Sequence, residues 1–395
     1  QDPYGEVNGG AGYFFTRRFN ARLGTGITKN NFSFEGRASR ITSNGYIDRA
    51  SSDLTSYYLA ASHTTKKSSI KLISFGGHEK TYQAWWGVPS SFLESNRTFN
   101  PYTYDNEVDN YQQYHYQLLT SYQITKDLSA TLNGHYTRGY GYFEQYKGVE
   151  ENPITNYYSK EDLEDYGIDP LIFGTDTIRQ TELIRRRWLD NHFYGAVYSL
   201  QWKPSNTYSA TFGGGYNQYL GDHYGELRWV EFAGDSEIGD RYYDNTAIKN
   251  DVNFYYKNIW QFAPKWHWFG DLQFRNVYYD FSGINDNGSP LRKNASLNFL
   301  NPKTGLTYRP SENWKLYGSF SVGNREPNRN DYTENPNNEI PEPETMYDYE
   351  LGAEWSRQKF ALKANGYFMD YFNQLVVTGE LNDVGAAKRV NIRDS

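Results

Sequence analysis

The sequence predicts an all-β protein, specifically a transmembrane antiparallel β-barrel, and three observations favour this class. Segments of roughly ten residues alternate apolar and polar side chains, with an aromatic residue at one end. The connections between these segments alternate in length, one short and the next long. Large aromatic residues flank most of the short connections. A soluble β-sandwich has no reason to shorten every second connection, whereas a barrel with tight periplasmic turns and long extracellular loops has all three features.

The alternation is clearest in segments that begin at Leu128, Tyr208 and Trp314. Their apolar faces consist of Leu128, Ala130, Leu132, Gly134 and Tyr136; of Tyr208, Ala210, Phe212, Gly214 and Tyr216; and of Trp314, Leu316, Gly318, Phe320 and Val322. Mostly small, polar or charged residues lie between them. A period of two puts these apolar side chains on one face of a strand. We therefore expect Leu132, Phe212 and Phe320 to point toward lipid rather than into a protein core.

The composition agrees with a barrel and leaves one soluble alternative open. The chain has 395 residues, of which 37% are hydrophobic, 18% are aromatic and 38 are Tyr. The mean hydropathy is -0.85, and no stretch approaches the roughly 18 apolar residues of a membrane-spanning helix. Tyr and Trp favour the membrane interface, because the ring is apolar and its tip is polar. The alternative is a soluble, sugar-binding β-protein.

Charge and cysteine content exclude other classes. The net charge is -7 and the pI is about 5.6, which gives no electrostatic footprint for nucleic acid. The chain has no Cys, so it has neither disulfides nor a Cys-based metal site. It opens Gln1-Asp2-Pro3 without Met and ends Arg393-Asp394-Ser395 without a terminal aromatic. We expect a processed or excised start and a C-terminal truncation.

Two sets of connections define the expected topology. The short turns are expected at Thr28–Asn31, Thr64–Ser68, Thr125–Asp127, Lys203–Asn206, Ala263–Lys265, Arg309–Asn313 and Ser356–Lys359. The long loops are expected over Asn44–Ser52, Gly77–Asn110, Tyr142–Asp190, Leu220–Lys249, Ser282–Arg292 and Asn324–Thr345. The segments between them amount to about sixteen strands. Within the third loop, Ser159–Tyr166 begins like a capping box and predicts a short helix.

Three stretches resemble the barrel of TonB-dependent outer-membrane receptors, particularly those of the Bacteroidetes branch. Gly45–Leu54 (GYIDRASSDL) is similar to the first extracellular hairpin of that family. Gly77–Pro89 (GHEKTYQAWWGVP) is similar to its third extracellular loop. Asn324–Tyr332 (NREPNRNDY), followed by Tyr347–Gly352 (YDYELG), is similar to its seventh loop and the strand that returns from it. The resemblance spans the whole chain.

The resemblance implies a barrel of about 22 strands that an N-terminal plug fills. Residues 1–395 would be a partial barrel domain with about sixteen of those strands and without the plug. The plug would carry the segment that engages TonB and half of the substrate site. The implied function is active transport across the cell outer membrane. The implied partners are TonB (through the plug), membrane lipid, lipopolysaccharide and a small-molecule nutrient.

Transport requires a binding surface at the outer mouth rather than a catalytic constellation. Tyr82, Trp85 and Trp86 offer rings that could stack on a large ligand, or that could instead pack the loop against the rim or the plug. The second group is a compact polar cluster that consists of Arg325, Glu326, Asn328, Arg329 and Asp331. Its Arg residues suit an anionic ligand such as a ferric siderophore. Its mixed charge also fits a salt-bridge network within the protein.

Other residues carry weaker signals. The basic run Arg185–Trp188 is either a contact for lipopolysaccharide or ligand, or a solvated loop end. His78 and His223 are expected in loops, where a role in haem binding stays open. Asp222, Asp235, Asp240 and Asp244 share one expected loop, but their spacing lacks an EF-hand pattern. No His pair has metal-ligand spacing, so we expect no metal site and no cofactor.

The leading hypothesis is a receptor that imports an iron–siderophore complex. Cobalamin, haem or oligosaccharide import by the same fold is the alternative, and a barrel enzyme is a further one. No Ser–His–Asp grouping can be found in the sequence, so we expect that the protein is not an enzyme.

Overall fold

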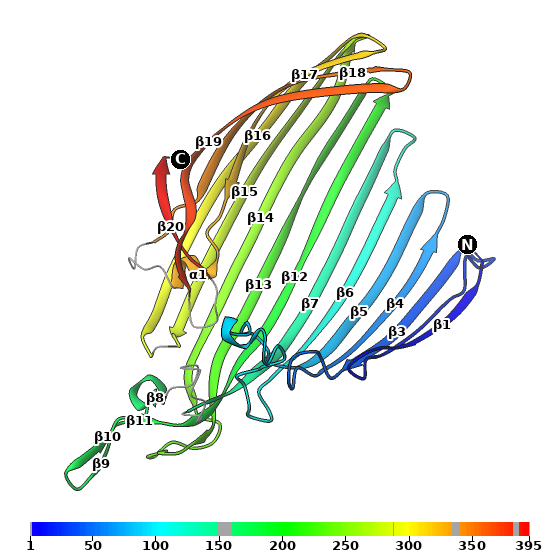
Figure 1. Cartoon of the computed structure of the whole chain (residues 1–395). Helices are drawn as coiled ribbons and strands as arrows, with labels where there is room; N and C mark the ends of the chain where they lie inside the picture. The colour runs from blue at the N-terminus through cyan, green and yellow to red at the C-terminus, as the bar shows by residue number, and fades with distance from the viewer. Residues whose placement is uncertain (1, 149–159, 287, 334–339, 382–386, 395) are drawn as a thin grey trace.

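The computed structural model describes residues 2–148, 160–286, 288–333, 340–381 and 387–394. Among these residues, sixteen strands form one sheet. Each strand of this sheet pairs antiparallel with the next one along the chain, so the strands lie side by side in the order in which they occur in the sequence. Figure 1 shows the sheet as one curved wall with the N- and C-terminal strands at its two edges. The predicted all-β architecture and antiparallel topology are confirmed.

The strands of the first half of the sheet are β1 (Tyr4–Ala11), β2 (Arg17–Gly24), β3 (Phe32–Ser43), β4 (Ser52–Thr64), β5 (Ser68–Tyr82), β6 (Val108–Gln123), β7 (Leu128–Lys147) and β12 (Leu183–Ser205). Those of the second half are β13 (Tyr208–Val230), β14 (Arg241–Ala263), β15 (Trp266–Ile284), β16 (Pro290–Ser311), β17 (Trp314–Arg325), β18 (Glu344–Arg357), β19 (Phe360–Leu381) and β20 (Ala387–Asp394). Two small two-stranded sheets consist of β8 (Glu161–Asp162) with β11 (Gln180–Thr181) and of β9 (Leu171–Phe173) with β10 (Asp176–Ile178). The helical turns are η1 (Ser90–Phe92), η2 (Leu163–Tyr166) and α1 (Arg329–Thr333).

The predicted turns lie together at one rim of the sheet, the upper rim in Figure 1. Large aromatics cluster beside them. The ring of Trp266 stacks 4.3 Å from that of Tyr308 and 6.4 Å from that of Phe262. This aromatic rim is the side that the sequence assigned to the periplasm.

The opposite rim differs in part from the expectation. The strand pair β13–β14 continues through most of the predicted loop Leu220–Lys249, which leaves only residues 231–240 as the connection. Likewise the expected loop Ser282–Arg292 shrinks to residues 285–289. Strands of 23 residues exceed the 9 to 11 or so that cross a bilayer, so these hairpins rise well above the hydrocarbon. The sequence prediction assigned these extracellular strand ends to loops because polar and apolar residues do not alternate regularly there.

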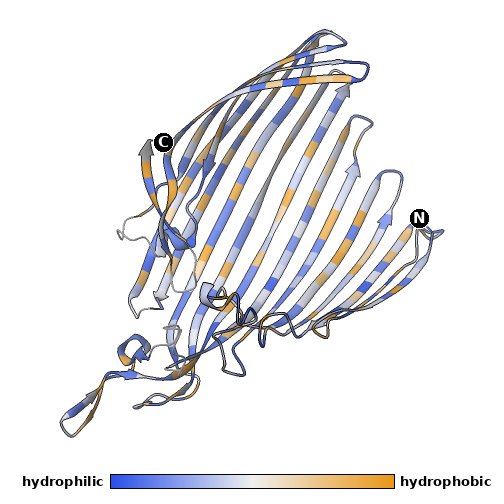
Figure 2. Cartoon of the chain, viewed as in Figure 1, coloured by the Kyte–Doolittle hydropathy of each residue, from blue (hydrophilic) through white to orange (hydrophobic). Residues whose placement is uncertain are grey.

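The two faces of the wall follow the predicted alternation, which Figure 2 shows as alternating hydrophobic and hydrophilic residues along the strands. The side chain of Leu132 is 59% exposed and that of Phe212 is 44% exposed, as expected for lipid-facing positions. Phe320 is partly buried. Its ring lies 5.0 Å from that of Tyr349, its partner across the β17–β18 ladder, so it shares the face of this exposed neighbour.

Buried apolar clusters lie toward the rim that carries the long loops. One cluster joins η2 to the ends of β12, β13 and β14 and includes Leu163, Leu183 and Tyr242. Another joins α1 to β14, β15 and β16 and includes Phe281 and Tyr332. These clusters fix the loops against the wall.

The helix that was predicted over Ser159–Tyr166 is wrong in extent and type. Ser159 lies outside the described residues, Glu161–Asp162 is extended, and only Leu163–Tyr166 forms a 3₁₀ turn. Gly167, at φ +72°, ends this turn in the left-handed region. In the described part of the chain, no helix is both long and apolar enough to cross a membrane.

Candidate ligand-binding vestibule

The segment from Glu326 to Thr333, which includes α1, packs against one face of the wall. Glu326 accepts hydrogen bonds from Lys249 on β14 and from Arg275 and Tyr279 on β15, and all three donors alternate with lipid-facing positions. We call this side of the sheet the lumen face. The half of the lumen face that lies toward the long loops is called the vestibule.

Glu326 is the most strongly paired residue of the segment. Its Oε1 lies 2.7 Å from Lys249 Nζ and 2.8 Å from Arg275 Nη2, and its Oε2 lies 2.9 Å from Tyr279 Oη. Burial acts to raise the pKa of this carboxyl, but the hydrogen bonds and charges of Lys249 and Arg275 outweigh it and hold the pKa below its usual value. Glu326 is thus an ionised anchor and not an open ligand site.

The rest of the polar cluster is also paired within the protein. Asn328 and Asp331 cap each other, since each side chain accepts a hydrogen bond from the backbone N–H of the other, at 3.1 and 2.7 Å. Asp331 also accepts two hydrogen bonds from Arg389 on β20, at 3.0 and 2.7 Å. The guanidinium of Arg329 lies 5.4 Å from the centre of the Phe281 ring and donates to Asn245. Of the two interpretations, the salt-bridge network matches these contacts.

Arg325 differs from its neighbours because its side chain is 50% exposed. Its Nη2 lies 3.3 Å from the carboxylate of Glu344, the residue opposite it at the start of β18. The side chain of Glu344 is only 10% exposed, so this ion pair joins an accessible cation to a buried carboxylate at the edge of the vestibule.

Of the predicted aromatic group, Tyr82 is buried and Trp85 and Trp86 are not. The Tyr82 hydroxyl donates a 2.8 Å hydrogen bond to the carbonyl of Tyr104, and burial raises the pKa of Tyr82 to about 12. Tyr82 therefore packs loop 83–107 onto the wall. Trp85 and Trp86 are 48% and 50% exposed, so they retain accessible ring surface.

A residue from the basic run continues the surface of Trp85. The Trp85 ring meets the ring of Phe143 edge-on, with centroids 5.4 Å apart. The guanidinium of Arg187 lies 5.7 Å from the centre of Phe143 and 5.5 Å from that of Tyr243. Arg187 also pairs with Asp286 at 3.0 Å. We call Trp85, Phe143, Arg187 and Tyr243 the aromatic row.

His223 lies between the two predicted groups. It is partly buried on β13, and burial together with the positive charges of Arg329 and Arg187 lowers its pKa to about 3. Both arginines are thus close enough to act on one imidazole. The fold brings the polar segment and the aromatic row to neighbouring parts of one vestibule, although their residues are far apart in sequence.

Sequence reasoning missed Phe143 and Tyr243 and misread the basic run. Arg185, Arg186 and Arg187 lie in β12 and not in a solvated loop. Arg186 faces outward and pairs with Glu144, while Arg185 is only 8% exposed and donates to Tyr166 and Gln145. If the alternation of this strand had been extended back to Leu183, it would have predicted that Arg186 faces outward and that Arg185 and Arg187 face inward.

The structure places both histidines and two of the four aspartates in strands, whereas Asp235 and Asp240 lie in the connection 231–240 as expected. His78 and His223 lie in strands, and His78 is hydrogen-bonded to Asn110 at 2.7 Å. Asp222 and Asp244 are strand residues that bond Thr246 and Arg241. Among the residues that the structure describes, no group of three or more His, Asp or Glu side chains could hold a metal ion.

The class of protein follows from comparison with known families. Residues 155–394 match the family described as TonB dependent receptor-like, beta-barrel. The chain belongs to this family, whose members are outer-membrane receptors and transporters rather than enzymes. The family is located in the outer membrane, as the sequence predicted. A soluble sugar-binding protein and a barrel enzyme are thereby set aside.

Solved structures share the fold at low sequence identity. The ferric-catecholate import receptor Fiu from Escherichia coli K12, in its closed form, superposes with a TM-score of 0.67 at 13% identity, covering 99% of this chain and 60% of its own. The copper transporter OprC gives 0.71 at 11% identity, with 99% and 57% coverage. The ferric citrate transporter FecA, unliganded, gives 0.67 at 12%, with 98% and 53% coverage. This chain thus spans little more than half the length of these receptors, and no curated protein matches its sequence.

Proposed function

We propose that the intact protein containing this chain imports an iron–siderophore complex through the outer membrane. The observation that carries the proposal is the aromatic row, where the Arg187 guanidinium lies near the rings of Phe143 and Tyr243 and the Phe143 ring contacts the exposed indole of Trp85. Rings stack on the flat organic part of a chelate, and Arg suits its anionic oxygens. Fiu and FecA, which share the fold, are named for ferric-catecholate and ferric citrate transport.

In this proposal Trp85 and Trp86 contact the ligand directly, and Tyr82 holds their loop. Arg325, at the edge of the vestibule, supplies the more accessible cation, since its side chain is 50% exposed and that of Arg187 is 16% exposed. Glu326, Asn328 and Arg329 contribute indirectly. They hold the segment 326–333 in place, and the ligand rests against this segment. The assignment to the Bacteroidetes branch rests on sequence motifs alone and stays a prediction.

A plug domain and TonB complete the proposed mechanism. The lumen face of β3–β6 has a hollow of about 440 Å³ whose lining includes Arg37, Tyr58, Glu79, Tyr111 and His115. Such a polar surface suits contact with a folded plug rather than with lipid. We propose that the intact receptor supplies this plug, which engages TonB.

Tryptophan fluorescence of the intact receptor tests the ligand class. We expect a ferric siderophore to quench emission and malto-oligosaccharide to leave it unchanged. Replacing Trp85 by Phe should remove most of the quenching. The control is Trp202→Phe, because Trp202 is similarly exposed (48%) but lies beside a tight turn at the other rim. Quenching by the oligosaccharide alone, or equal quenching in both variants, would contradict the proposal.

Copper is the second candidate, because OprC shares the fold with the highest of the three scores. A copper transporter requires soft or imidazole ligands, and the described residues contain no group of three or more His, Asp or Glu side chains that could hold a metal ion. Uptake assays with radioactive copper and radioactive ferric siderophore, run in parallel on cells carrying the intact receptor, separate the two. Haem and cobalamin serve as competitors in the same assay.

A further inference from the structure

The stretch 84–99 carries Trp85 and Trp86 and is held almost entirely by its two ends. Every residue of the stretch is described and none is buried. Directly outside it, Gln83 is 1% exposed and Asn100 is 2% exposed. Asn100 Nδ2 donates a 2.9 Å hydrogen bond to the carbonyl of Gln83, so the two ends are joined, as in an Ω-loop. The position of the two indoles therefore depends mainly on what holds Gln83 and Asn100.

Asn100 is held by the motif Gly45–Leu54, to which the proposed function gives no role. Its Nδ2 also donates to the carbonyl of Asp48 at 2.9 Å, and its own carbonyl accepts a 2.7 Å hydrogen bond from Arg49 Nη2. The backbone N–H of Asp48 donates to the carbonyl of Thr98 at 2.7 Å. Arg49 has a φ of +63°, which is uncommon for a residue other than Gly. These bonds keep a strained residue in place and attach one end of the loop to the neighbouring connection.

Gln83 is held by a chain of buried polar side chains. Its Nε2 donates to the carbonyls of Val108 and Glu144, and its Oε1 accepts a 3.3 Å hydrogen bond from Gln145 Nε2. Gln145 Oε1 in turn accepts a 3.1 Å hydrogen bond from Arg185 Nη2. Gln145 and Arg185 are each 8% exposed. Because a buried polar group that loses its partner is costly, such a chain favours one relative position of its members.

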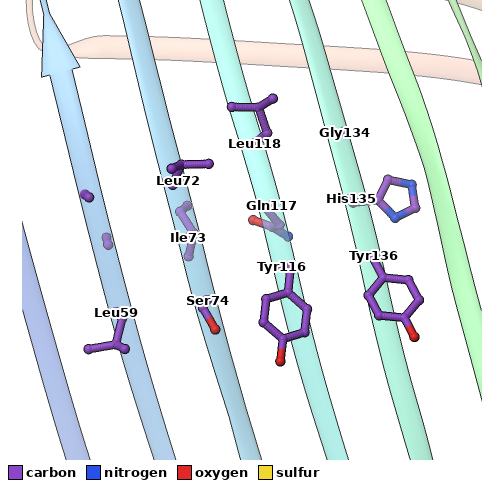
Figure 3. Close-up of a pocket in the computed structure, with 12 residues that line it drawn as sticks. Leu59, Leu72, Ile73, Ser74, Tyr116, Gln117, Leu118, Gly134, His135 and Tyr136 are labelled. Carbon is purple, nitrogen blue, oxygen red and sulfur yellow. The ribbon is translucent and has the colours of Figure 1, made fainter.

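The register of the wall places this chain on the lumen face. Gln145 is paired with Arg185 across the β7–β12 ladder, so the two side chains lie on the same face. Gln145 is an even number of positions from His135 on β7, and His135 is paired with Gln117 across the β6–β7 ladder. Figure 3 shows Gln117 behind the ribbons and the lipid-facing Leu118 in front of them. The chain therefore lies inside the mouth of the barrel and faces away from lipid.

The chain ends in segment 160–182, which has a packed core of its own. Arg185 Nη1 donates a 3.0 Å hydrogen bond to the hydroxyl of Tyr166, and this hydroxyl donates to Glu161 at 3.1 Å. Leu163 and Tyr166 are 0% and 4% exposed and belong to the cluster that joins η2 to the ends of β12, β13 and β14. The chain thus connects a well-packed segment to a loop that has no buried residue.

We propose that segment 160–182 is a positioning element for the ligand site, although it carries none of the residues assigned to ligand contact. The chain from Tyr166 to Asn100 holds Trp85 and Trp86 in their half-exposed arrangement before a ligand arrives. Less conformational freedom is then lost on binding, so the affinity is higher. The inference rests on the proposed function for the role of the two indoles, whereas the chain itself is testable without a ligand.

Hydrogen–deuterium exchange of the intact receptor without ligand tests the chain. Tyr166→Phe removes the hydroxyl that Arg185 contacts and keeps the buried ring, and Gln145→Met breaks the chain in the middle. We expect the amides of 84–99 and of Asp48 to exchange about fivefold faster in Tyr166→Phe, which is the effect of about one net hydrogen bond. Exchange should be faster still in Gln145→Met, which loses both of its bonds. Heat-dependent migration on gels verifies that each variant is folded.

The matched control is Tyr242→Phe. Tyr242 belongs to the same buried cluster, its ring lies 4.6 Å from that of Tyr166, and its hydroxyl has no hydrogen-bond partner among the described residues. The change removes a buried hydroxyl without breaking the chain, so exchange over 84–99 should stay as in the unmodified receptor. Equal acceleration in Tyr242→Phe and Tyr166→Phe would mean that the whole cluster loosens, and it overturns the proposal. So does unchanged exchange in both chain variants.

Tryptophan quenching then measures the affinity for two probes, a ferric catecholate and ferric citrate, for which Fiu and FecA are named. We expect Tyr166→Phe to bind the active probe about fivefold more weakly and Tyr242→Phe to bind it normally. Faster exchange with unchanged affinity overturns the proposal, because the position of the indoles would not matter for binding. If even the unmodified receptor binds neither probe while the exchange result holds, the proposed ligand class is wrong and the positioning of the loop is supported.

Discussion

Loop 83–107 and the segment 326–333 lie in the same vestibule but use their side chains in opposite ways. The segment buries its charges in pairs, such as Asp331 with Arg389 and Glu326 with Arg275. The loop is fixed by Tyr82 and holds two indoles half exposed. The difference shows that a cluster of mixed charge at a barrel mouth indicates how a loop is anchored to the wall rather than where a ligand binds. Accessible aromatic surface is therefore the basis of the binding site that we propose.

The largest effect is expected from Glu326→Gln. This change leaves Lys249 without a carboxylate partner in a partly buried site, while Arg275 keeps its ion pair with Asp251, and we expect it to cost about 3 kcal/mol. We expect hydrogen exchange of the amides of 326–333 to accelerate in the intact receptor. The neighbouring control is Arg325→Gln, which should cost only about 1 kcal/mol, because Arg325 is half exposed and its buried partner Glu344 keeps a hydrogen bond from the backbone N–H of Leu375. Similar exchange rates in the two variants would show that Glu326 is not an anchor.

An intermediate effect is expected from acidification, through His223. Its pKa is lowered from 6.5 to about 3 in the folded protein, so the unfolded chain binds a proton between these values that the folded chain does not. The neutral His223 therefore contributes to the free energy of unfolding above pH 6.5, and this contribution is lost as pH falls toward 3. At pH 5 the free energy of unfolding is lower by about 2 kcal/mol. Denaturant unfolding at pH 7.5 and pH 5 measures the loss.

The matching variant for this pH effect is His223→Gln. It should lose less stability than the unmodified receptor between pH 7.5 and pH 5, because it has no proton to take up at that position. The same pH dependence in both proteins would assign the titration to other groups.

The smallest effect on stability is expected from Trp85→Ala. Trp85 is half exposed and has one edge-on ring contact, with Phe143, so we expect a loss of about 1 kcal/mol. If Trp85 contacts the ligand, the same variant should bind it at least about tenfold more weakly, as anchoring aromatics do. A loss of several kcal/mol in stability with unchanged ligand binding would give Trp85 the role of Tyr82 and remove the contrast between the two regions.

The sequence predicted the wall well because its determinants are local. Period-two alternation needs only neighbouring residues, and turn chemistry at positions such as Lys203–Asn206 needs only a few more. The predicted strand ends are wrong where the polarity of neighbouring residues does not distinguish a strand from a loop. The ends of β13 and β14 stand above the bilayer and mix polar residues with buried ones such as Leu227 and Tyr242, so the regular alternation that marks a strand in lipid disappears there.

The sequence by itself thus determined the fold class, the order of strands, the aromatic rim and the lipid-facing positions, because lipid on one side and water on the other impose a pattern on each strand. Only the tertiary structure decided which loop residues meet. Arg187 lies between Phe143 and Tyr243, and Asp331 pairs with Arg389, because a curved sheet brings distant strand ends and loops together. Such contacts depend on curvature and register summed over many strands, and no local pattern encodes them.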